Sequence, residues 1–72
     1  MPTKASLWQK WLRHMGSPCS DSDVREARAW FDELYDAGRK GQYLKTHACG
    51  EPLSYDEREV LDLGLRERRH DH

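Results

Sequence analysis

Hydrophobic residues recur at helical spacing in three separate stretches of this chain. The first stretch predicts an amphipathic helix over residues 4–15, which Thr3 or Ser6 can cap and which Gly16 ends. Its apolar face is about 140° wide at roughly 100° per residue. The residues of this face are Leu7, Trp8, Trp11, Leu12 and Met15.

The second stretch predicts a helix over residues 21–37 that Gly38 ends. Ser20, Asp21 and Ser22 are each competent to cap its start. One stripe of this helix is apolar and comprises Val24, Ala27, Phe31, Leu34 and Tyr35, widened by Trp30 and Ala37. The acidic residues on the opposite side, which we expect to face solvent, include Glu26, Asp32, Glu33 and Asp36.

The third stretch has a clear start signal, because Ser54 and Glu57 have the spacing of a capping box. It predicts a helix over residues 55–69, followed by a disordered tail over residues 70–72. The face of this helix is formed by Val60, Leu61, Gly64 and Leu65, and the missing side chain at the glycine would let another helix approach closely. Leu63 points nearly the opposite way, so we expect it at the surface, either as an isolated leucine or in a contact with another chain.

Between the second and third helices, residues 38–52 ("GRKGQYLKTHACGEP") hold three glycines and a proline. This composition predicts a connection with at most a short helical turn at residues 42–45. Such a long connection is uncommon in a small domain and suggests either a binding role or an internal staple. The chain is therefore predicted to be all-α: one helical domain over residues 1–72, folded as a small three-helix bundle with a long Gly-containing connection between helices two and three.

Composition and charge narrow the classes of function. A domain of this size buries only about 60% of the surface of its unfolded chain, so we expect Trp8 and Trp11 in the core. The net charge is only −1, which predicts neither a strongly basic nucleic-acid surface nor an acidic mimic of one. No apolar run long enough for a membrane span and no apolar core of a signal peptide occur, so we expect a cytoplasmic protein without membrane contacts.

The candidate metal ligands are two histidines and two cysteines: His14, Cys19, His47 and Cys49. Their number matches a tetrahedral zinc site, but the spacing within each His and Cys pair lies at or below the usual limit for such sites. A disulfide between Cys19 and Cys49 would require an oxidising compartment. We therefore favour two unconnected thiols and no cofactor, with zinc as the alternative.

No arrangement in the sequence predicts catalysis. The adjacent carboxylates Asp32 and Glu33, like Asp56 and Glu57, splay apart on a helix. A histidine two residues before a cysteine in a loop seldom activates its thiol, and the "GRKG" segment does not match a phosphate-binding loop. We expect a protein that is not an enzyme.

The remaining interpretation is a module that binds a protein, as an inhibitor, adaptor or accessory subunit. The acidic side of the second helix (Glu26, Asp32, Glu33 and Asp36) would meet a basic partner, and Leu63 would contribute an apolar contact or a homodimer interface. The alternative is a nucleic-acid-binding module that uses the basic loop over residues 39–45. Its contacts would be Arg39, Lys40, Tyr43 and Lys45, with the tyrosine stacking on a base.

Overall fold

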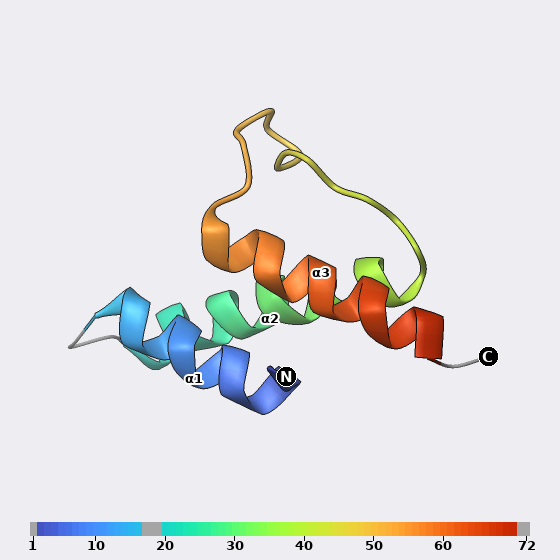
Figure 1. Cartoon of the computed structure of the whole chain (residues 1–72). Helices are drawn as coiled ribbons and strands as arrows, with labels where there is room; N and C mark the ends of the chain where they lie inside the picture. Colours follow the sequence, from blue (N-terminus) through green and yellow to red (C-terminus); the bar gives the residue numbers. More distant parts are fainter. Residues whose placement is uncertain (1, 17–19, 71–72) are drawn as a thin grey trace.

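The computed structural model describes residues 2–16 and 20–70, and over these residues it confirms the predicted all-α three-helix fold (Figure 1). Helix α1 spans Lys4–Met15, α2 spans Asp21–Arg39 and α3 spans Tyr55–His70. The predicted start of each helix is correct. Helix α3 includes His70, which the sequence assigned to a disordered tail, whereas the rest of that tail lies outside the described residues.

Short-range side-chain hydrogen bonds begin each helix where the sequence predicted. At α1, the Ser6 amide donates to the Thr3 hydroxyl over 3.1 Å, and the Thr3 amide donates to the Ser6 hydroxyl over 2.9 Å. At α2, the Asp23 amide donates to the hydroxyl of Ser20 over 3.2 Å. These bonds satisfy amide groups that the helices themselves leave without a partner.

Helix α2 continues through Gly38, where the sequence predicted that it would end. It ends instead in a Schellman motif, in which Gln42 donates to the Ala37 carbonyl over 2.8 Å and Gly41 donates to the Gly38 carbonyl over 2.9 Å. Gly41 has φ +81°, a conformation that L side chains rarely adopt, so Gly41 is the terminating glycine.

Gly38 serves the contact between α2 and α3. A Cβ atom placed on Gly38 would lie 2.4 Å from the Leu61 carbonyl oxygen and 2.9 Å from the Cα of Gly64. A Cβ atom on Gly64 would lie 2.4 Å from the Tyr35 carbonyl oxygen. The close approach predicted for Gly64 is therefore present, and it needs a glycine on both helices.

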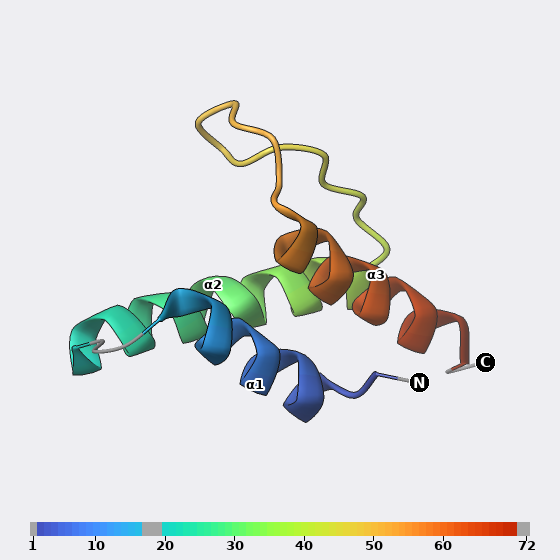
Figure 2. The ribbon, with the colours of Figure 1, turned by 60° about the vertical axis from the view of Figure 1, so that its left-hand side comes forward.

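The core lies between α2 and α3, and α1 covers its edge (Figure 2). The side chains of Phe31 and Leu34 are fully buried, and Val60 and Leu61 on α3 are nearly so. Both α1 tryptophans pack edge-on against the Phe31 ring and are half-buried, with centroid distances of 5.2 and 5.4 Å. Such aromatic contacts add to the stabilisation by burial.

Helix α1 runs antiparallel to α3 (Figure 1). Lys10 and His14 on α1 pair with Glu59 and Asp56 on α3, and Leu7 and Leu63 belong to one core cluster. Lys10 Nζ lies 2.7 Å from Glu59 Oε1, and this hydrogen bond raises the pKa of the lysine. His14 Nδ1 pairs with the Asp56 carboxylate.

The sequence-based placement of Leu63 at the surface is wrong. Leu63 is only 6% exposed and belongs to the core cluster, together with Leu7. The pattern of α3 alone shows the face that packs on α2, whereas α1 covers a second face that contains Leu63. Its side chain therefore packs mainly within the chain, and only a small part of it is left for a contact with another chain.

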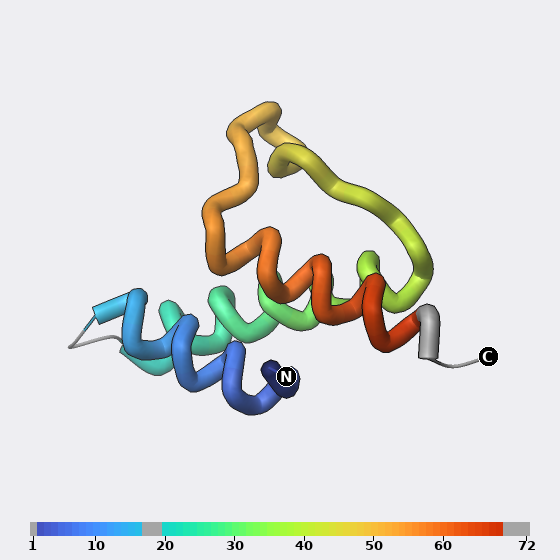
Figure 3. Tube along the Cα trace, in the orientation of Figure 1, coloured from blue at the N-terminus to red at the C-terminus, as the bar shows by residue number. Residues whose placement is uncertain are grey.

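The connection between α2 and α3 spans residues 40–54 and arches away from the helices (Figure 3). An antiparallel bridge joins Thr46 and Pro52, and the His47 amide donates to the Glu51 carbonyl over 2.6 Å. Gly50, with φ +91°, forms the turn at the tip. Residues 42–45 have no regular secondary structure, so the short helical turn predicted there is not formed.

Candidate binding groove between α3 and the connection

One buried carboxylate ties the connection to the helices. Glu57 is 8% exposed and accepts a hydrogen bond from the Ser54 amide over 2.9 Å, as the capping box predicted. The same carboxylate accepts from Trp30 Nε1 on α2 and pairs with His47 Nε2 of the connection at 2.9 Å. The His47 ring also stacks on Trp30, with centroids 5.1 Å apart. Glu57 therefore holds α2, α3 and the connection together.

The surroundings of Glu57 act on its pKa in opposite directions. Burial, the largest single influence, raises the pKa, because a charged carboxylate loses solvation. Hydrogen bonds from Ser54 and Trp30 and the charge of His47 together lower the pKa below its usual value. Glu57 therefore remains ionised, and its charge is compensated locally.

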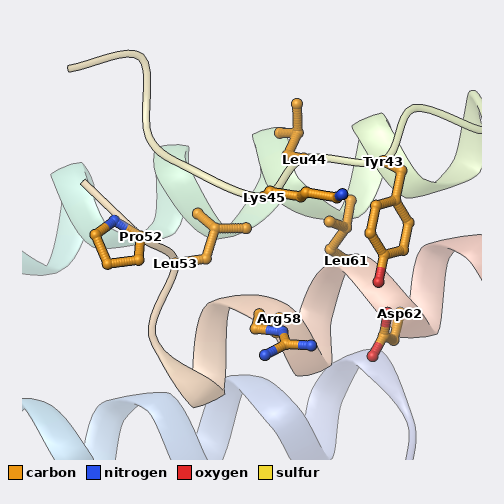
Figure 4. Close-up of a pocket in the computed structure, with 8 residues that line it drawn as sticks. All are labelled: Tyr43, Leu44, Lys45, Pro52, Leu53, Arg58, Leu61 and Asp62. Atoms are coloured by element: carbon orange, nitrogen blue, oxygen red, sulfur yellow. The ribbon is translucent and has the colours of Figure 1, made fainter. Parts of the chain in front are cut away.

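An open groove of about 270 Å³ lies between the anchored connection and α3 (Figure 4). Its apolar part includes Leu53 and Leu61, which belong to the core cluster, and the more exposed Pro52. We call this feature the α3 groove, and its lining residues are Tyr43, Leu44, Lys45, Pro52, Leu53, Arg58, Leu61 and Asp62.

Polar and aromatic groups surround this apolar surface. Tyr43 is 60% exposed, and its hydroxyl is directed toward Asp62 (Figure 4). Lys45 on the connection and Arg58 on α3 are exposed and place two cations beside the groove. The α3 groove can therefore take up an apolar side chain and pair with acidic groups on either side of it.

The acidic side chains predicted as a partner surface lie on α2, outside the α3 groove. Glu26, Glu33 and Asp36 are exposed, as expected. The Asp32 carboxylate is engaged within the chain, 3.3 Å from Lys4 Nζ and 3.2 Å from Arg28 Nε. Three of the four acids thus remain available to a basic partner.

The residues of the alternative nucleic-acid surface are only partly gathered. Tyr43 and Lys45 line the α3 groove, whereas Lys40 is exposed at the end of α2. Arg39 is a half-buried residue in the last turn of α2. Sequence reasoning missed Arg58 and its neighbours on α3, because only the folding of the connection over this helix joins them to the loop.

The described members of the predicted zinc set are not brought together. His14 pairs with Asp56, His47 pairs with Glu57 and Cys49 is exposed. Cys19 lies outside the described residues, as does the predicted alternative of a disulfide with Cys49. Among the side chains of residues 2–16 and 20–68, no three Cys, His, Asp or Glu groups are arranged to hold a metal ion.

Comparisons with known proteins identify no relative. No protein-family model matches this chain, and no curated protein or solved structure matches it significantly. In the part of the chain that the structure describes, no helix is both long enough and apolar enough to cross a membrane.

Proposed function

We propose that this protein is a non-enzymatic, cytoplasmic protein-binding module that holds a segment of a larger partner in the α3 groove. The observation that supports this proposal is an open apolar groove beside an exposed tyrosine, Tyr43, and two cations, Lys45 and Arg58. Tyrosine and arginine are the residues on which binding energy is often concentrated in protein interfaces. By binding a segment of its partner in this groove, the module would act as an inhibitor, adaptor or accessory subunit.

A protein segment suits this groove better than a nucleic acid. Its lining includes two core leucines, Leu53 and Leu61, which match an apolar side chain. Asp62 is exposed beside Arg58 and would repel a phosphate backbone that followed the cations of α3. Of the predicted loop contacts, Arg39 and Lys40 do not line the groove.

The proposal can be tested by selecting random 16-residue peptides from a display library on the purified protein. We expect the selected peptides to carry an apolar residue next to acidic residues. Tyr43→Ala or Arg58→Glu should weaken their binding about tenfold, as measured by fluorescence anisotropy. Arg25→Glu, at an exposed position of α2, is the matched control and should leave binding unchanged.

Two results would contradict this proposal. One is that the selection enriches no peptide, or only peptides whose binding both groove variants retain. The other is tighter binding of a 12-nucleotide single-stranded RNA or DNA that Arg58→Glu abolishes and that weakens steeply with salt, which would favour the nucleic-acid function.

A further inference from the structure

A second hollow, of about 350 Å³, lies against the same helix as the α3 groove. Tyr55, the first residue of α3, lines the second hollow, which also reaches Pro2, before the start of α1. We call it the Tyr55 hollow, and its lining residues are Pro2, Tyr55, Arg58, Glu59, Asp62, Leu63 and Arg66. Arg58 and Asp62 line both cavities, so they form a ridge of α3 between them.

Each cavity contains one strongly exposed aromatic side chain. Tyr43 in the α3 groove is 60% exposed, and Tyr55 in the other cavity is 75% exposed. Within residues 2–16 and 20–68, these are the large hydrophobic side chains that the fold leaves exposed. Their position on either side of one ridge indicates a continuous contact surface, since exposed apolar groups gathered on one face mark interaction sites.

The charges of this surface are predominantly positive. Arg58, Asp62 and Arg66 are exposed along one face of α3, and Lys45 adds a cation from the connection. The other acid of the second cavity, Glu59, is bonded to Lys10 Nζ at 2.7 Å and is thereby neutralised. Apart from the paired Glu59, the charged lining residues are therefore three cations and one acid, Asp62.

From this arrangement we infer that the two cavities form a single docking surface for an acidic segment of a partner protein, which crosses α3 and places one apolar side chain in each cavity. This inference rests on the proposed function and specifies the chemistry of the partner. The positive charges select an acidic segment and speed its encounter. We expect two apolar anchor residues in the segment, because Tyr43 lines one cavity and Tyr55 lines the other.

The test uses the highest-affinity peptide from the selection, labelled with fluorescein, and the full-length protein. We expect the selected peptides to carry two apolar positions at a fixed spacing among acidic residues. Tyr55→Ala should weaken binding about tenfold and Arg66→Glu about fivefold, with the larger effect of Arg66→Glu at low salt. Arg25→Glu should again have no effect, and unchanged melting curves would show that each variant is folded.

A peptide with either apolar anchor replaced by serine locates each contact. Loss of the anchor that enters the Tyr55 hollow should weaken binding to the wild type. It should have little further effect on binding to Tyr55→Ala, because both changes remove the same contact. The corresponding experiment with Tyr43→Ala and the anchor that enters the α3 groove should give the same pattern. This coupling would establish that both cavities hold one segment.

The outcomes separate the inference from the proposed function. If Tyr43→Ala weakens binding while Tyr55→Ala and Arg66→Glu do not, the two-cavity inference is wrong and the module binds through the α3 groove alone. Enrichment of basic peptides would overturn the assigned partner chemistry. Self-association in sedimentation that Tyr55→Ala abolishes would instead identify a second copy of this chain as the occupant.

Discussion

Glu57 shows how one side chain can stabilise several elements at once. Its spacing from Ser54 predicts a capping box, and that local bond is present. The fold adds Trp30 from α2 and His47 from the connection to the same carboxylate. Glu57 is therefore a tertiary contact as well as a cap, and the wall of the α3 groove depends on it.

Replacing Glu57 by glutamine should destabilise the protein by about 2 kcal/mol, because hydrogen bonds to a charged group are lost at a buried position. Urea unfolding followed by tryptophan fluorescence measures this change. Glu59→Gln is the matched control and should cause a clearly smaller loss, since its ion pair with Lys10 is more accessible to water. Equal losses for the two variants would contradict the role assigned to Glu57.

The lowered pKa of Glu57 also predicts how stability depends on pH. A carboxyl group with a lower pKa in the folded state stabilises the protein above its unfolded pKa, and this contribution is lost as the pH falls through the folded value. The difference in unfolding free energy between wild type and Glu57→Gln should therefore be largest at neutral pH and shrink as the pH falls through the ordinary pKa of a glutamate and then through the lower folded value. A difference that grew on acidification would show that folding raises the pKa of Glu57 instead of lowering it.

At the scale of elements, the contact between α2 and α3 depends on two glycines. Gly38 and Gly64 approach so closely that neither position has room for a methyl group. Glycine weakens a helix by roughly 1 kcal/mol relative to alanine, so its use in the middle of two helices indicates a packing requirement. The axis of α3, and with it the position of the groove, follows from this crossing.

Gly38→Ala should destabilise the protein by about 2 kcal/mol, because overpacking outweighs the gain in helix propensity. Thermal unfolding followed by circular dichroism measures the effect. Ala29→Gly, at an exposed site of α2, is the control and should cost about 1 kcal/mol through propensity alone. An increase in stability for Gly38→Ala would show that the helices do not cross at this distance.

At the scale of the whole molecule, two groups of exposed charges have opposite signs. The acids Glu26, Glu33 and Asp36 lie on the outer side of α2, whereas Lys45, Arg58 and Arg66 lie around α3. Under the proposed function, an acidic segment that fits the cations around α3 would be repelled by the acids of α2, which favours selectivity.

The arrangement of histidines and cysteines gives a prediction about metals. His14 and His47 are engaged by carboxylates of α3, and the described residues form no group of three potential ligands. We therefore expect EDTA to leave the melting temperature unchanged, as measured by differential scanning fluorimetry on protein without an affinity tag. A fall of several degrees, reversed by zinc, would restore the zinc site as the explanation.

The sequence by itself determined the local features of this protein. The periodicity of apolar residues and the candidate caps before each helix predicted three helices and their starts, because these signals act between residues a few positions apart. The structure selects Thr3 and Ser20 among the candidates, and Ser54 caps the third helix as predicted. The close approach at Gly64 was also predictable, since a glycine within an apolar face permits it.

Only the tertiary structure decided the features that depend on contacts between distant segments. Leu63 is buried because α1 covers a second face of α3, and Gly38 lies within α2 because it meets Gly64. The α3 groove likewise exists because the pair of Glu57 with His47 and the burial of Leu53 hold the connection beside α3. The pattern within one helix does not specify which partner covers its remaining faces, and that choice determines the surface left for binding.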